Sequence, residues 1–212
     1  MQARQPRGRT PGPTTAISTR QVLDSALAEV ICTANDAYLH DLARSESREG
    51  VDHALPPGVM ASLSALDGVA RRRIAAVPFT LFSMRFNDPS YWQTLLERPV
   101  AGQRRAAGDG FGRTAVFLAW HVVQAGPATA GVTLGMSSEV AALYQWMPLG
   151  ELDRIGGLAQ AVMAPRWPTH SAFWQRLLAA ARSTVAIETA RFMGLQLLAA
   201  ESLLDPRMRS RA

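Results

Sequence analysis

Apolar residues recur every three or four positions along most of the chain, which is the spacing of amphipathic α-helices. No segment shows the sustained alternation of apolar and polar residues that is typical of a half-buried strand. The helical spacing covers residues 19–45, 56–66, 69–77, 89–96, 114–124, 138–146, 148–158, 171–182 and 184–204. Two short apolar stretches, 79–86 and 162–167, are predicted to be extended. The pattern as a whole therefore predicts an all-α protein.

Proline, glycine and short acidic side chains mark where these helices begin and end. Pro56 and Pro57 suit a first helical turn, and Asp67 is placed to cap the helix that follows it. Asp88 followed by Pro89 is the same type of start signal, and Ser137 or Ser138 is a further candidate cap. The stretch 125–131, which contains Gly and Pro, is expected to interrupt the helical pattern.

Composition divides the chain into segments. Residues 1–18 are rich in Pro, Gly, Thr and Arg and are predicted to form a disordered basic arm. Gly and Arg dominate residues 98–113, which are predicted to be a linker. The expected order is the arm 1–18, a helical unit 19–97, the linker 98–113, a second helical unit 114–182, a C-terminal helix 183–204 and a basic tail 205–212.

The two helical units repeat each other. The sequence RFNDPSYWQTLL begins at Arg85, and RWPTHSAFWQRLL begins at Arg166, 81 residues later. At that spacing residues 55–86 align with 136–167 without a gap. One extra residue after the second Arg-aromatic pair then aligns Trp92 with Trp174. A period this long exceeds that of a solenoid and indicates two copies of a small helical domain.

The shared motif has two interpretations, a cofactor-binding box or a packing signature. Each tryptophan follows another aromatic residue and precedes a Leu-Leu pair at helical spacing, which is the usual pattern of core residues. We therefore interpret the motif as a core signature of the repeat. Its residues are Arg85, Phe86, Trp92, Arg166, Trp167 and Trp174.

Charge and cysteine content limit the function classes. The 212 residues carry a formal net charge of +5, and every basic residue is Arg. The single cysteine, Cys32, excludes a disulfide within the chain and a Cys-rich zinc site. We find no signal-peptide pattern and no apolar run long enough for a membrane span, so a cytoplasmic protein is expected.

Catalytic motifs are not apparent in the sequence. His40, His53, His121 and His170 have no partners at metal-ligand spacing, and neither H-E-x-x-H nor C-x-x-C occurs. The Gly-rich stretch 108–112 has neither the Lys-Ser/Thr nor the preceding strand of a phosphate-binding loop. We expect a protein that is not an enzyme and that has no cofactor and no metal site.

Arginine clusters are the candidates for contact with DNA phosphates. Neighbouring helical residues point about 100° apart, so Arg71, Arg72 and Arg73 cannot all face the same way. Arg104, Arg105 and Arg113 form a second cluster in the predicted linker. The alternative is that both clusters are solvated surface, which is the common role of charged runs.

Two segments resemble the flagellar transcriptional activator FlhD family. Residues 71–88 are similar to the end of that family's helical core, and residues 135–155 are similar to its helix start and helix handover. The likeness lies in Phe82, Met84, Arg85, Phe86, Asn87 and Asp88, and in Gly135, Met136, Ser138, Val140, Pro148 and Leu152. The chain departs from the family in carrying two units, in having Trp167-Pro168-Thr169 in the second, and in its last helix.

The resemblance implies a function. FlhD proteins self-associate and bind promoter DNA together with a second protein, FlhC. A tandem member would be a pseudo-dimer within one chain, with an FlhC-like partner and duplex DNA as its ligands. The alternative is a helical adaptor or chaperone-like interaction module with no role at DNA.

Overall fold

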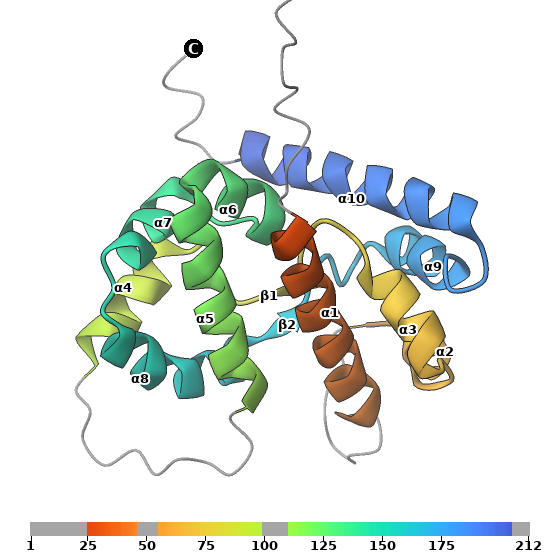
Figure 1. The fold of residues 1–212 in the computed structure, drawn as a ribbon, viewed down its shortest axis with the longest axis horizontal. Helices are drawn as coiled ribbons and strands as arrows, with labels where there is room; N and C mark the ends of the chain where they lie inside the picture. Colours follow the sequence, from red (N-terminus) through yellow and green to blue (C-terminus); the bar gives the residue numbers. More distant parts are fainter. Residues whose placement is uncertain (1–24, 46–54, 99–109, 205–212) are drawn as a thin grey trace, which may run out of the picture.

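The structure is a computed structural model that describes residues 25–45, 55–98 and 110–204 (Figure 1). The expected all-α class is confirmed, since helices make up most of the described chain and the strands are two residues long. The helices are α1 (Ser25–Ser45), α2 (Pro57–Ser64), α3 (Gly68–Ala75), α4 (Pro89–Glu97), α5 (Gly110–Ala125), α6 (Pro127–Leu134), α7 (Ser138–Gln145), α8 (Leu149–Ala159), α9 (Ser171–Ala179) and α10 (Thr184–Leu204). The strands are β1 (Phe82–Ser83) and β2 (Ala164–Pro165), and a 3-10 turn, η1, spans Gln160–Val162. The predicted arm, most of the linker and the tail lie outside the described residues.

Side-chain caps begin three of the helices where the sequence predicts them. Asp67 accepts a hydrogen bond from the amide of Ala70 at 2.7 Å, at the start of α3. Asp88 accepts one from the amide of Tyr91 at the start of α4, and Ser137 accepts one from Val140 at the start of α7. Each cap satisfies an amide that has no partner inside its own helix.

The stretch 125–131 differs from the expectation of a simple interruption. The chain breaks only at Gly126, whose φ of 153° ends α5, and Pro127 then begins α6 at once. Helix α6 packs against α5 and buries Ala130 and Leu134. Pro at the first position and burial of two apolar side chains outweigh the weak helix preference of the segment. Helix α5 also begins at Gly110, earlier than the predicted start near residue 114.

The two repeats meet at the β1–β2 pair and are related there by an approximate twofold axis. Ser83 and Ala164 occupy equivalent places, 81 residues apart, and they are antiparallel partners of each other. A position that pairs with its own equivalent lies on a twofold axis. The same 81-residue spacing relates the first residues of α2 and α7, and those of α3 and α8. The crossing strands therefore set the relation between the two repeats.

Beyond the crossing, the repeats exchange their fourth helices. Helix α1 packs on α2 and α3, and α5 packs on α7 and α8. Helix α4 of the first repeat, however, packs on α7 and α8, while α9 of the second repeat packs on α2. Figure 1 shows the resulting lobes, with α4 among α5 to α8 on the left and α9 beside α2 and α3 on the right. Each lobe is thus built from both repeats.

The extra residue of the second repeat enters before Trp167, which corrects the sequence alignment. Arg85 (φ 55°) and Trp167 (φ 51°) are the two non-glycine residues with positive φ in the described chain, so Trp167 is the structural equivalent of Arg85. The residues that cap the next helices support this register: the amide of Asp88 donates to the carbonyl of Arg85 at 2.9 Å, and the amide of His170 donates to that of Trp167 at 3.0 Å. The Trp92 indole donates to the carbonyl of Arg85 at 3.0 Å, whereas the Trp174 indole is shared between the carbonyls of Arg166 at 3.2 Å and Trp167 at 3.3 Å. The sequence alignment missed this shift because Arg85 and Arg166 are each followed by an aromatic residue.

Helix α10 packs on α9, and two of its side chains hydrogen-bond to the end of α3 and to the segment that follows β2. Near its middle, Arg191 donates to the carbonyl of Ala76 at 2.6 Å. Near its end, Glu201 accepts hydrogen bonds from the Arg166 guanidinium at 3.0 Å and from the Trp167 indole at 2.6 Å. Among the described residues, no helix combines the length and the apolar character needed to span a bilayer.

Candidate functional site

The aromatic residues of the repeated motif lie in the core. Phe86, Trp92, Trp167 and Trp174 are all buried. Trp92 stacks on Phe86, with ring centroids 5.8 Å apart, and meets Tyr144 of α7 edge-on at 5.2 Å. These contacts join α4 to the opposite repeat, so the motif is part of the interface between the two repeats.

The two arginines of the motif have different environments. Arg85 is exposed, and its guanidinium lies 5.3 Å from the ring centre of Tyr91. The Arg166 side chain is only 4 % exposed and donates to the carbonyl of Thr133 at 3.2 Å as well as to Glu201. Burial lowers the pKa of Arg166, and the Glu201 carboxylate partly opposes that shift. Arg166 therefore has a structural role, because its ion pair with Glu201 attaches α10 to the segment after β2.

Each of the three adjacent arginines of α3 has a hydrogen-bond or ion-pair partner within the chain. The Arg71 side chain donates to the Asp36 carboxylate at 2.8 Å, and Arg72 forms an ion pair with Glu29. Arg73 points elsewhere and donates to the carbonyl of Ala181, just beyond α9, at 2.5 Å. The expected divergence of neighbouring side chains is present. A phosphate would have to compete with these partners, and direct DNA contact by the three arginines stays a prediction.

The second arginine cluster is described only in part. Arg104 and Arg105 lie outside the described residues. Arg113 belongs to the first turn of α5 and forms an ion pair with Asp153 of α8. Its role at DNA likewise stays a prediction.

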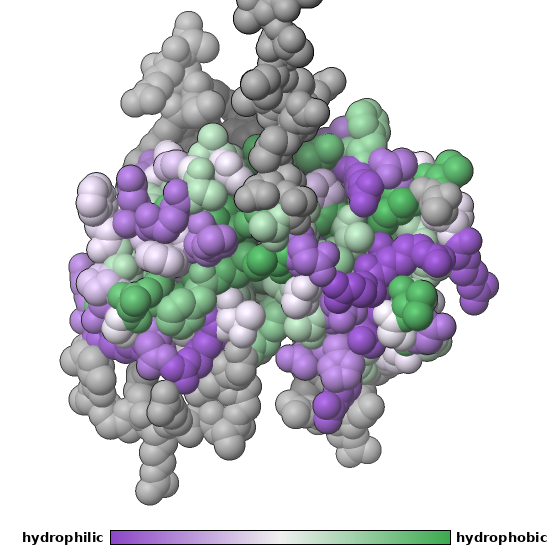
Figure 2. All heavy atoms as spheres, in the orientation of Figure 1, coloured by the Kyte–Doolittle hydropathy of each residue, from purple (hydrophilic) through white to green (hydrophobic). Residues whose placement is uncertain are grey.

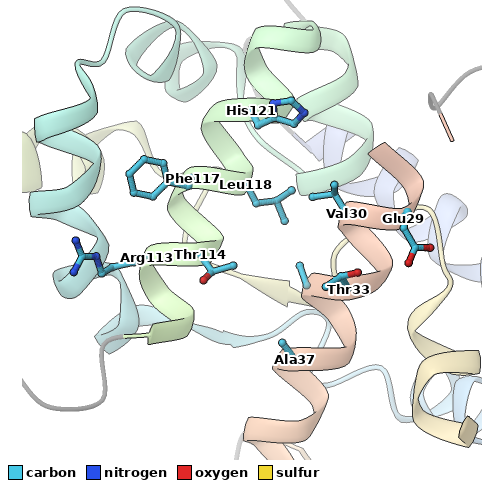
Figure 3. Close-up of a pocket in the computed structure, with 10 residues that line it drawn as sticks. Glu29, Val30, Thr33, Ala37, Arg113, Thr114, Phe117, Leu118 and His121 are labelled. Carbon is cyan, nitrogen blue, oxygen red and sulfur yellow. The ribbon is translucent and has the colours of Figure 1, made fainter. Parts of the chain in front are cut away.

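A groove lies between α1 and α5 and is a candidate binding surface (Figure 3). Its volume is about 720 Å³. The described residues that line it all belong to those two helices. The lining residues are Glu29, Val30, Thr33, Ala34 and Ala37 on α1 and Arg113, Thr114, Phe117, Leu118 and His121 on α5.

The floor of the groove is apolar and its outer edges are charged. Figure 3 shows Val30 and Leu118 directed toward each other from the two helices. Glu29 lies at the outer edge of α1 and Arg113 at the outer edge of α5. Figure 2 shows the same distribution, with apolar side chains over the centre of this face and hydrophilic ones toward both sides.

Twofold-equivalent positions line the groove on both helices. Thr33 and Thr114 are 81 residues apart, and so are Ala37 and Leu118. The edges do not follow this symmetry, because the position equivalent to Arg113 is Cys32. Cys32 is buried, and burial raises the pKa of its thiol, which disfavours the reactive thiolate.

Sequence reasoning did not find this groove. Val30 belongs to the apolar stripe of its helix, which suggests core packing, yet its side chain is 41 % exposed. The signal that could have indicated a surface is the small and polar residues, such as Thr33 and Ala37, beside that stripe. The groove itself depends on the distance between α1 and α5, which no local pattern specifies.

The described histidines and acids do not gather into a site. His40 and His121 are twofold-equivalent positions on α1 and α5, and both are exposed. His170 precedes α9 and makes no side-chain cap there. Within residues 25–45, 55–98 and 110–204, no three His, Cys, Asp or Glu side chains are grouped so that they could hold a metal ion. His53 lies outside those ranges.

Comparisons of the chain with protein-family models, with curated proteins and with solved structures found no match.

Proposed function

We propose that this protein is a non-enzymatic transcriptional regulator subunit that resembles FlhD and acts on promoter DNA together with a partner protein. The observation that carries the proposal is the antiparallel pairing of Ser83 with Ala164. It relates the repeat that contains residues 71–88 to the repeat that contains residues 135–155 by an approximate twofold axis. A tandem copy of a self-associating chain is expected to have this relation.

The exchanged helices also support a fused pair of repeats. Helix α4 rests on α7 and α8, and α9 rests on α2, so neither repeat completes its own lobe. A surface that two chains would use for pairing is therefore internal in this chain. Under this proposal the chain is a pseudo-dimer, and the remaining open surface, including the α1–α5 groove, is left for a different protein.

The proposal is tested by the affinity for duplex DNA in the presence of the partner. The full chain is used as bait in extracts of its native bacterium, and captured proteins are identified by mass spectrometry. Binding of the purified complex to labelled promoter fragments is then measured over a range of salt concentrations. Contacts to phosphates predict an affinity that falls steeply with salt. A chain recovered without a stoichiometric partner, or a complex without salt-dependent binding, would rule the proposal out.

The arginine candidates are tested on the same complex. Arg71→Ala and Arg72→Ala together are expected to weaken DNA binding and to reduce the salt slope if those side chains meet phosphates. Arg176→Ala with Arg182→Ala is the matched control, because both side chains are exposed and belong to α9 and its end. Equal affinity of the two double variants would remove Arg71 and Arg72 from the interface.

A second candidate function is a helical adaptor with no role at DNA. The observation that favours it is that Arg71, Arg72, Arg73 and Arg113 all have partners within the chain. A groove lined mainly by apolar side chains also suits a protein ligand better than a phosphate backbone. Under this alternative a partner is captured, but the complex binds promoter and unrelated DNA equally weakly.

A further inference from the structure

Two exposed arginines of the first repeat differ from the arginines that the sequence proposed for DNA contact. The described members of that earlier set are engaged by acids or carbonyls of this chain. Arg85 and Arg98 are exposed, and neither guanidinium pairs with a carboxylate within the described residues. A guanidinium without such a partner keeps its donors for an anion from outside the chain.

Arg85 and Arg98 share one neighbour, Tyr91. The Arg85 guanidinium lies 5.3 Å from the centre of the Tyr91 ring. Arg98 follows Tyr91 by seven residues at the end of α4, so the two side chains leave the same face of the helix. Burial raises the pKa of Tyr91, and the charges of Arg98 and Arg85 oppose that rise, which agrees with two guanidinia near the phenol. The Tyr91 hydroxyl makes no hydrogen bond within the described residues, so it too can donate to a ligand.

The second repeat shows that these three positions can be apolar. Their equivalents, 82 residues later, are Trp167, Phe173 and Ala180, and all three are buried. The rings of Trp167 and Phe173 pack edge to face with centroids 4.9 Å apart. Helix α10 packs on α9 (Figure 1), whereas no described helix packs on α4 in the same way. An apolar set in one repeat therefore corresponds to two cations and a phenol in the other.

The nearby carboxylates do not neutralise this donor cluster, which consists of Arg85, Tyr91 and Arg98. Asp88 accepts the amide of Tyr91 at 3.0 Å as the cap of α4, and its charge affects the pKa of Tyr91 less than either arginine does. Glu97 precedes Arg98 in the chain, but neighbouring helical side chains diverge by about 100°. The donor cluster therefore keeps an excess of positive charge and of hydrogen-bond donors.

A row of phosphates matches the donor cluster better than a single carboxylate side chain. The planar fork of Arg fits phosphate oxygens, and Arg and Tyr side chains both occur among the groups that contact DNA phosphates. The seven residues from Tyr91 to Arg98 extend over about 10 Å of helix. Phosphates follow one another closely along each DNA strand, so a cluster of this length can meet more than one of them.

From these observations we propose that Arg85, Tyr91 and Arg98 contact the phosphate backbone of duplex DNA. The inference rests on the proposed function, because DNA is its ligand, and it places the contact on α4 rather than on α3. The contact is independent of base sequence, since phosphates carry no sequence information.

Binding of the full chain to a fluorescein-labelled 20-bp duplex tests the proposal. Fluorescence anisotropy is measured over a range of salt concentrations, and neither a promoter sequence nor a partner is needed. Arg85→Gln with Arg98→Gln is expected to weaken binding at least about tenfold. The same change should lower the slope of log K against log salt by about 2, one for each arginine. A parent chain without saturable binding, or an unchanged slope in the double variant, would overturn the proposal.

A second pair of exposed arginines controls for net charge. Arg176→Gln with Arg182→Gln removes the same charge from α9 and the segment after it, and should keep the affinity within about twofold of the parent. Circular dichroism verifies that both double variants keep the helical content of the parent. Equal losses of affinity in the two would show that only net charge matters and would refute the site.

Tyr91→Phe removes one neutral donor and keeps every charge. It is expected to weaken binding about threefold and to leave the salt slope unchanged, because no phosphate loses a cationic partner. A Tyr91→Phe variant that binds as tightly as the parent would exclude the hydroxyl from the contact.

Polyglutamate of the same total charge as the duplex is the competitor that distinguishes phosphate from carboxylate. It is expected to displace the duplex only weakly. Displacement as strong as that by unlabelled duplex would assign the donor cluster to an acidic protein and would overturn the proposal.

The same variants in complex with the partner separate this inference from the proposed function. Promoter binding that survives the loss of Arg85 and Arg98 would overturn the inference and leave the proposed function standing. Binding of the chain to DNA through the donor cluster, in a complex that does not distinguish promoter from unrelated DNA, would support the contact and remove the function.

Discussion

Arg73 and Arg154 occupy equivalent positions of the two repeats, and each donates to the carbonyl end of a helix that belongs to the other repeat. Arg73, in α3, reaches the carbonyl of Ala181 beyond α9. Arg154, in α8, reaches three carbonyls at the end of α4, with distances of 3.0 to 3.3 Å to those of Leu96, Arg98 and Leu95. The last carbonyls of a helix have no partners inside it, and a cation there also interacts favourably with the helix dipole. The exchange of fourth helices is therefore stabilised by the same interaction on both sides.

Removing the Arg154 guanidinium is expected to destabilise the protein substantially. Arg154→Gln should lower the free energy of unfolding by about 2 kcal/mol, because several carbonyls lose a charged donor. Arg72→Gln is the matched control, since that arginine is half exposed and its ion pair with Glu29 is also exposed, and it should cost less than about 1 kcal/mol. Urea denaturation followed by circular dichroism gives both values. Equal losses would contradict a capping role for Arg154.

Two buried tyrosine hydroxyls predict sensitivity to alkaline pH. The hydroxyls of Tyr38 and Tyr144 have no hydrogen-bond partner within the described residues. Burial raises the pKa of both side chains far above its usual value near 10. Above about pH 10 the unfolded chain loses these protons while the folded chain keeps them, so stability should fall by about 1.4 kcal/mol per pH unit for each tyrosine.

Replacing both tyrosines by phenylalanine tests the predicted alkaline sensitivity directly. Tyr38→Phe with Tyr144→Phe should raise the pH of alkaline unfolding and leave stability at pH 7 unchanged or slightly higher, because an unpaired buried hydroxyl is removed. The measurement is thermal unfolding between pH 7 and 11.5. A double variant that unfolds at the same pH as the parent would show that other groups control the transition.

Substitution by alanine should change the stability in opposite directions at two glycines of α8. A Cβ at Gly156 would lie 2.9 Å from the Cα of Arg113, so α5 and α8 could not keep their present distance. Gly156→Ala is expected to cost roughly 1–3 kcal/mol, the usual range for overpacking. A Cβ at Gly150 would meet nothing within 4 Å, and Gly150→Ala should stabilise by about 0.5 kcal/mol through helix propensity. Thermal unfolding of the two variants measures both signs, and stabilisation by Gly156→Ala would show that the helices separate easily.

Two glutamates of α10 also form a matched pair. Glu201→Ala should lower stability by about 1–3 kcal/mol, because it leaves the buried Arg166 without its carboxylate. Glu188→Ala removes an exposed partner of Arg191 from the same helix and should cost less than about 0.5 kcal/mol. Hydrogen exchange of α10 in each variant adds a local readout. Faster exchange along α10 is expected only in Glu201→Ala, and equal exchange would contradict its anchoring role.

Much of the helical content could be predicted because its causes are local. The spacing of apolar residues gave the helices, and Asp67 and Asp88 gave two of their starts, since a cap acts within three residues of chain. Helix α6 could not be predicted in this way. Its start at Pro127 is a local signal, but its stability depends on burial of Ala130 and Leu134 against other helices.

The candidate site was predictable only as separate residues. Sequence reasoning identified the arginines of α3 but not their partners, because Asp36, Glu29 and Ala181 are far from them in the chain. It identified Val30 as part of an apolar stripe but not as a wall of a groove. Both results depend on the distances between helices, which neither periodicity nor composition encodes.

By itself the sequence determined an all-α protein with two similar units. Helix spacing and caps depend on residues a few positions apart, and the 81-residue repeat can be found by comparing the chain with itself. Only the tertiary structure decided which unit each fourth helix completes. Helices α4 and α9 each bury a tryptophan and a leucine, so their local sequence pattern does not distinguish the lobe that each of them joins. The crossing at Ser83 and Ala164 directs each of them to the opposite side, and the carbonyl contacts of Arg73 and Arg154 hold them there. The groove between α1 and α5 likewise depends on the distance between those two helices.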